Sequence, residues 1–205
     1  MPIPRRLTVL VAAVAIAGLA GAGCTEQSAA VRVGDTTVSQ SDFEAELDEF
    51  GANDVLAGSD PSAGIRIGGD LAGSYSQDLV AYVLGRRVLY TVGETLFDEH
   101  DLELSDDDRS VAEQQLSGEF GEAFAAFDGD YRRRLTDDFA RLVRLQDELG
   151  AEQLDQQLRA TFDATDIEVS SHYGSWDPDQ YMVVPPEGPA PARGQDSGGG
   201  TSDGG

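Results

Sequence analysis

The sequence predicts a mainly α-helical domain that carries a small antiparallel sheet. Several segments between residues 41 and 162 repeat apolar side chains at the three- and four-residue spacing of an amphipathic helix. Two shorter segments, at about 30–39 and 166–174, alternate apolar and polar residues as strands do. The length of 205 residues suits one domain with appendages. We therefore expect four to five helices and a sheet made of an N-terminal hairpin and a C-terminal closing strand.

The N-terminus has the composition of an export signal. Two arginines at positions 5 and 6 precede an apolar run over residues 7–19, which is too short to span a bilayer and is typical of a signal peptide. The next residues, Ala-Gly-Ala-Gly-Cys, resemble the lipobox of bacterial lipoproteins. That resemblance implies export by Sec, cleavage between Gly23 and Cys24, and lipid attachment to Cys24 on the outer face of the cell membrane.

Cysteine usage agrees with this interpretation. Cys24 is the only cysteine of the chain, so no intramolecular disulfide can form, and a thioether to a lipid would leave no free thiol. Residues 1–23 would then be the signal peptide and 24–29 a tether. Gly21 stands where lipoboxes usually have Leu. The alternative is an ordinary signal peptide followed by an incidental cysteine.

The predicted hairpin at 30–39 is centred on Gly34-Asp35, which suits a two-residue turn because glycine adopts a positive φ at its first position. This turn places Val33 opposite Thr36 and Val31 opposite Val38. The apolar residues then share one face of the hairpin, so the register agrees with the hydrophobic pattern.

The first half of the chain then predicts two helices separated by a loop. Ser41-Asp-Phe-Glu44 is a capping-box sequence that opens a helix through Phe50. Residues 51–74 lack a period and predict a loop, unless they hide a helical turn. A helix is expected at about 77–99. Its apolar ridge at four-residue spacing is Val80, Leu84, Val88, Val92 and Leu96.

Three more helices follow. Ser105 and the three aspartates after it cap a helix that runs through Val111, Leu116 and Phe120, with an extension to Phe127 as the alternative. Further helices are expected at about 131–149, stopped by Gly150, and at about 152–162.

The segment Asp166-Ile-Glu-Val-Ser-Ser-His-Tyr-Gly174 predicts the closing strand, added as a third strand to the hairpin. Its alternation places His172 on the polar face, and Trp176 is expected to cap the sheet. Residues 177–205, rich in Pro, Gly and Ser toward the end, are expected to form a disordered acidic tail, which leaves 30–176 as the folded domain.

Charge and motifs exclude several functions. The formal net charge is −24 and all 14 basic residues are arginine, so the chain repels phosphate backbones and nucleic-acid binding is not expected. The absence of lysine removes Schiff-base and P-loop lysine chemistry. The two histidines, His100 and His172, lie in no catalytic motif. We expect no enzyme activity, no metal site and no cofactor.

The order of elements resembles the SurA N-terminal family, related to PrsA and trigger-factor chaperones. The resemblance rests on "VRVGDTTVSQSDFEAELDEF" after the cysteine and on the long apolar helix ending "FDEHDLELSDDD". It implies a membrane-tethered lobe that binds exported or unfolded polypeptides without ATP. The helix at 152–162 runs directly into the closing strand, which leaves no room for the parvulin domain of isomerase members.

A client groove would use apolar residues that the core does not need. The candidates are Phe50, Val55, Leu56, Ile65, Phe120, Phe124 and Phe127. The alternative is that these phenylalanines pack in the core. The alternative function is a structural or adaptor lipoprotein that binds one specific envelope partner.

Overall fold

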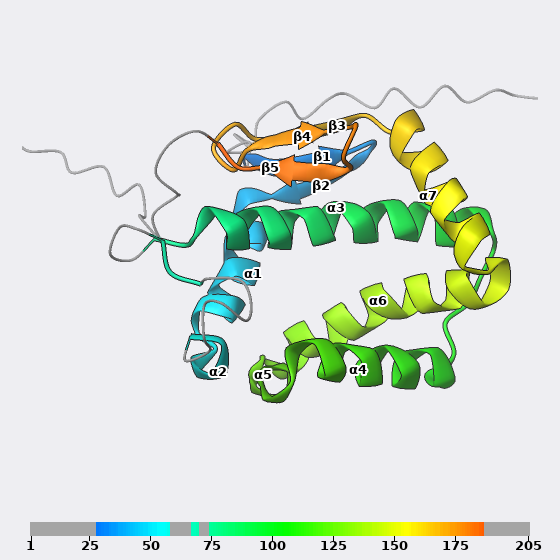
Figure 1. Ribbon diagram of the computed structural model, residues 1–205, viewed down its shortest axis with the longest axis horizontal. Coiled ribbons are helices and arrows are strands. Elements are labelled where there is room, and N and C mark those ends of the chain that lie inside the picture. The colour runs from blue at the N-terminus through cyan, green and yellow to red at the C-terminus, as the bar shows by residue number, and fades with distance from the viewer. Residues whose placement is uncertain (1–27, 58–66, 70–73, 187–205) are drawn as a thin grey trace, which may run out of the picture.

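The computed structural model describes residues 28–57, 67–69 and 74–186, and it confirms a mainly α-helical fold with a small antiparallel sheet (Figure 1). The helices of the described residues are α1 (Gln40–Gly51), α2 (Asp54–Ala57), α3 (Gln77–Glu99), α4 (Asp106–Phe120), α5 (Glu122–Ala126), α6 (Gly129–Leu149) and α7 (Ala151–Ala164). The strands are β1 (Ala29–Val33), β2 (Thr36–Ser39), β3 (Ile167–Val169), β4 (Ser175–Asp177) and β5 (Met182–Val184).

The sheet joins the two ends of the domain. β1 lies between β2 and β3, antiparallel to both. Val31 pairs with Val38 and Val33 with Thr36, so the register predicted for the hairpin is confirmed. Gly34 has a φ of 56° in the turn, where its amide donates to the carbonyl of Asp166 at 2.8 Å. The predicted pairing of the closing strand with the hairpin is also confirmed, since Val31 faces Val169.

The closing strand is shorter than the sequence predicts. It ends at Val169, and the amides of Tyr173 and Gly174 turn back to the carbonyl of Ser170. The reason is Tyr173, which is buried and meets Phe43 edge-on, with ring centroids 4.8 Å apart. Burying this ring bends the chain away from the sheet. His172 therefore lies exposed in a turn and not on the polar face of a strand.

The folded domain also extends beyond residue 176. β4 and β5 form a second antiparallel hairpin, in which Trp176 pairs with Val183. Val183 is fully buried, so residues 177–186 belong to the fold and the prediction of a tail from residue 177 is wrong for them. The sequence signal for β5 is a run of only three apolar residues, too short to distinguish from a tail. Residues 187–205 lie outside the described part.

The start of α1 differs from the predicted one. Ser39, and not Ser41, is the N-cap, and its hydroxyl accepts the amide of Asp42 at 3.1 Å. The strand β2 ends at Ser39, so the chain passes from sheet to helix without a linker. Within the predicted loop 51–74 the described residues contain the short helix α2 and a β-bridge between Gly68 and Tyr75.

Helix α3 is the central element, with the sheet on one side and α6 and α4 on the other (Figure 1). Its predicted bounds, 77–99, are confirmed, and its N-cap is Ser76. The residues of its predicted ridge are all buried. Gly93 allows α6 to approach closely, because a Cβ there would lie 2.5 Å from Leu142 Cδ2.

Helices α4 and α6 each begin at a side-chain cap and end at a glycine. Ser105 and Asp108 form the reciprocal capping box of α4, which ends at Gly121, so α5 is a separate helix and the extension to Phe127 is wrong. Val111 faces solvent and is not part of the core stripe. Asp128 caps α6, and hydrogen bonds from the amides of Asp130 and then Tyr131 lower the pKa of its carboxyl.

We expect Gly174→Ala to destabilise the fold by about 1 to 3 kcal/mol. Gly174 has a φ of 140°, and a Cβ there would overlap the backbone carbonyl oxygen of Val184. Urea unfolding followed by circular dichroism would measure the loss. Gly129→Ala is the matched control, since a Cβ at that position meets no atom within 4 Å. Equal stability of the two variants would contradict the close approach of the turn to β5.

Candidate binding groove and the charged network beside it

Three phenylalanines predicted to contact clients are instead in the core. Phe50, Phe124 and Phe127 are at most 4% exposed, and Phe120 is half-buried. Phe50 lies at the centre of an aromatic cluster, with edge-on ring contacts to Phe127 at 5.2 Å and Phe120 at 6.1 Å. Because these rings fill the junction of α1, α4 and α6, they are not presented to a ligand. The alternative given for them, core packing, holds for the buried three.

The other predicted positions are scattered. Val55, on α2, is 40% exposed, while Leu56 packs partly against the core. Neither residue lines the α3–α7 groove described below. Ile65, Gly23 and Cys24 lie outside the described residues.

The structure instead shows an open groove between α3, α7 and the β4–β5 hairpin, which we call the α3–α7 groove. It encloses about 700 Å³. Helix α3 contributes Ala81, Gly85 and Leu89, which follow one another at four-residue spacing and so share one face of the helix. These side chains are half-buried, in contrast to the buried ridge on the neighbouring face. The groove therefore runs along α3 where the core ends.

The other two walls are also largely apolar. Leu158 and Phe162, one turn apart on α7, form one wall, and Met182 and Val183 of β5 form the other. Met182 is 44% exposed, which makes it the most exposed large hydrophobic side chain of the described residues. Exposed apolar surface that lines a concave site is typical of a ligand or peptide site.

Aromatic stacking fixes the hairpin on α7. Trp176 stacks on Phe162 with ring centroids 5.6 Å apart and planes 23° from parallel. Tyr181 lies 5.4 Å from the same ring and donates its hydroxyl hydrogen to Asp163 at 3.1 Å. Trp176 thus anchors the second hairpin to α7, while its strand β4 contacts β3 of the three-stranded sheet. This anchoring fixes the position of the two walls of the groove relative to each other.

The depth of the groove is set by a glycine. A Cβ at Gly85 would meet no atom within 4 Å. Glycine in the interior of a helix costs about 1 kcal/mol relative to alanine. At Gly93 the same cost is offset by the close approach of Leu142, but at Gly85 no described side chain uses the space. The space over Gly85 is therefore part of the groove.

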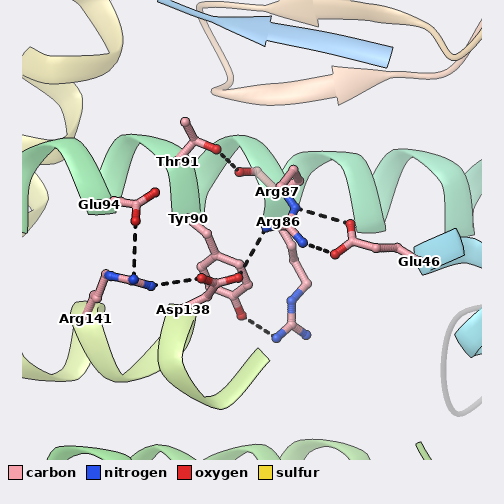
Figure 2. A network of polar contacts seen from close by, with 8 residues as sticks. All are labelled: Glu46, Arg86, Arg87, Tyr90, Thr91, Glu94, Asp138 and Arg141. Carbon is pink, nitrogen blue, oxygen red and sulfur yellow. Dashed lines mark hydrogen bonds and ion pairs between the residues drawn. The ribbon is translucent and has the colours of Figure 1, made fainter. Parts of the chain in front are cut away.

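A charged network lies across α3 from this groove and joins three helices (Figure 2). Arg87 of α3 pairs with Glu46 of α1 and, at 3.3 Å, with Asp138 of α6. Arg141 continues the network from Asp138, at 2.9 Å, to Glu94, at 3.3 Å. Glu46 is only 5% exposed, so its charge depends on Arg87 for compensation.

A second arginine, Arg86, connects the network to the groove. Its guanidinium lies over the rings of Tyr82, at 5.3 Å, and Phe120, at 5.1 Å, and bonds Glu119 at 2.9 Å. Burial raises the pKa of the Tyr82 and Tyr90 phenols, so both stay neutral and donate or accept hydrogen bonds without losing a proton. The cluster is thus suited to holding helices together, and not to proton transfer.

Within the described residues no group of His, Cys, Asp and Glu side chains could hold a metal ion. His100 Nε2 forms a 2.7 Å hydrogen bond with Gln157 Oε1, which ties α3 to α7. No helix of the described residues is long and apolar enough to cross a membrane.

Sequence reasoning missed the α3–α7 groove because its walls come from distant segments. One signal was present: Ala81, Gly85 and Leu89 form a second row beside the buried ridge of α3. A row of this kind predicts a further contact surface, but not what covers it.

A scan of family models, a search of curated proteins and a search of solved structures each found no match.

We expect Arg87→Met to destabilise the protein by about 3 kcal/mol, because it leaves the buried Glu46 charge without its partner. Arg144→Met is the control. Arg144 pairs only with Asp147 and Glu148 in the described structure, both on its own helix, and its loss should cost less than about 1 kcal/mol. Urea unfolding of both variants would measure the difference, and equal losses would contradict the central role of Arg87.

Proposed function

We propose that this protein is a membrane-anchored extracytoplasmic lipoprotein that binds extended segments of exported or unfolded polypeptides in the α3–α7 groove. Binding uses neither ATP nor isomerase chemistry. The observation that carries the proposal is the groove itself, which is open, largely apolar and lined by Leu89, Phe162 and Met182. An open apolar groove favours polypeptide over a small polar metabolite, because a metabolite would leave most of the apolar wall exposed.

The architecture supports reversible holding. The groove walls lie on α3, α7 and a hairpin anchored by Trp176, so the site exists before a client arrives. Burying apolar area gains about 25 cal/mol per Å², from which association and ordering costs are subtracted. A groove of about 700 Å³ covers only a few side chains. The resulting affinity is modest, which suits a protein that must release its clients.

The location follows from the N-terminal sequence. The signal-like residues 1–23 and the lipobox-like Cys24 support Sec export and lipid attachment on the outer face of the cell membrane. A client-binding domain fixed there would meet polypeptides as they leave the export channel.

We expect the full chain to suppress aggregation of chemically unfolded citrate synthase, followed by light scattering. Met182→Glu should weaken this effect by about tenfold in required concentration, because it places a charge against the apolar wall. Val111→Glu is the matched control: Val111 is 41% exposed, close to the 44% of Met182, but lies on α4 away from the groove.

Two results would contradict the holding function. Suppression that is equal in both variants would place client binding elsewhere. No suppression at stoichiometric excess, together with one partner that co-purifies with the chain, would support the adaptor function instead.

We expect Cys24→Ser to abolish lipid attachment and release the protein from membranes. A serine hydroxyl cannot form the thioether that carries the diacylglycerol, and stable anchoring needs at least two acyl chains. Labelling with radioactive palmitate and partition into detergent would measure both effects. Gly21→Leu, which keeps Cys24 and restores the usual lipobox residue, should retain the label. A labelled, membrane-bound Cys24→Ser variant would refute Cys24 as the lipid site.

A further inference from the structure

We propose that the α3–α7 groove selects one class of polypeptide: an extended segment whose bulky apolar side chain seats over Gly85 and whose flanks carry lysine or arginine. This inference rests on the proposed function and adds to it the depth and the charge that decide which segments bind. The depth of the groove depends on Gly85 of α3. Its negative charge comes from the rim and from the net charge of the whole molecule.

Two glycines on α3 differ in what lies over them. Gly93 is filled from outside the helix, since Leu142 Cδ2 lies 2.5 Å from where its Cβ would be. Gly85, two turns earlier, has no described atom within 4 Å of that position. It lies in the floor of the groove between Ala81 and Leu89. A bulky side chain from a bound polypeptide fits the space that the described residues leave empty.

The arginines that line the groove already have carboxylate partners. Arg159 bonds Asp155 at 3.0 Å and lies over the Tyr181 ring at 5.4 Å. Arg86 bonds Glu119 at 2.9 Å. Each of these cations is therefore paired with a carboxylate in the described structure.

One carboxylate at the rim lacks such a partner. Asp78 lines the groove and is exposed, and it forms no ion pair with the described part of the chain. Asp177 and Asp179 lie in the β4–β5 hairpin but not among the residues that line the groove, and within the described structure Asp177 accepts hydrogen bonds from neighbouring residues of its turn. Among the charged residues that line the groove, Asp78 is thus the one without an ion pair in the described structure, and its negative charge lies beside an apolar floor.

The electrostatic field of the whole molecule is also negative. With a formal net charge of −24, the protein attracts cationic segments and repels acidic ones over a distance of about one Debye length. Electrostatic complementarity of this kind raises association rates and discriminates between partners. An apolar segment with basic flanks matches both the floor and the rim.

Three peptides would test the charge preference. They share one tryptophan-free apolar core and differ only in flanks of two lysines, two serines or two glutamates on each side. Trp176 is the single tryptophan and stacks on Phe162 of the groove wall, so its fluorescence in the full chain reports binding. We expect the lysine-flanked peptide to bind at least about tenfold more tightly than the glutamate-flanked one, with the difference shrinking at high salt.

The outcomes separate this inference from the proposed function. Equal binding of all three peptides overturns the charge preference and leaves the polypeptide groove in place. Tighter binding of the glutamate-flanked peptide also overturns it. No binding of any peptide overturns the proposed function itself.

Substitution of Gly85, in the floor of the groove, tests whether a bound side chain occupies the space above it. Gly85→Phe should weaken binding of the lysine-flanked peptide by at least about tenfold, because its ring occupies the space over the floor. Gly118→Phe is the matched control, since Gly118 is also a helical glycine with no atom within 4 Å of an added Cβ, but it lies on α4 outside the groove.

Circular dichroism checks that both phenylalanine variants fold. Gly85→Ala provides a second test that needs no large side chain, because its methyl meets no described atom and favours the helix. We expect it to raise the thermal midpoint and to weaken binding by less than Gly85→Phe does. Wild-type affinity in Gly85→Phe would overturn Gly85 as the seat of the apolar side chain.

Discussion

Arg87 compensates a buried carboxylate, and the arrangement of the helices depends on it. Glu46 is almost fully removed from water on α1, and Arg87 of α3 supplies its charge partner while also reaching Asp138 of α6. A charge buried without a partner costs far more than an exposed one, so α1, α3 and α6 are favoured in the one arrangement that brings these groups together.

One side of α3 contacts this network, and its other sides pack in the core or line the groove. The ridge from Val80 to Leu96 is buried in the core. The adjacent row through Gly85 is covered by neither the network nor the sheet, and α7 and the second hairpin stand on either side of it. The stacked pair Trp176 and Phe162 keeps these walls in place. The groove is thus a consequence of how α3 is surrounded, and not of any single motif.

The sequence predicted the fold well where the signal is local. Pairing across Gly34-Asp35 follows from a turn that accepts only certain residues and from alternation over a few positions. The long helix α3 follows from a ridge repeated five times. Prediction failed where distant residues decide: Tyr173 bends the chain by packing on Phe43, and Val183 is buried only because α3 lies beneath β5.

By itself, the sequence determined the five longer helices, the first hairpin, the closing pairing of β3 with β1, and the strong negative charge. Each depends on residues close together in the chain or on simple composition. Only the tertiary structure decided that Phe50 and Phe127 are core residues and that Gly85 lies in an open groove. The physical reason is that the exposure of a side chain depends on which other segments pack against it. A phenylalanine and a glycine on amphipathic helices carry no local sign of which other segments will cover them.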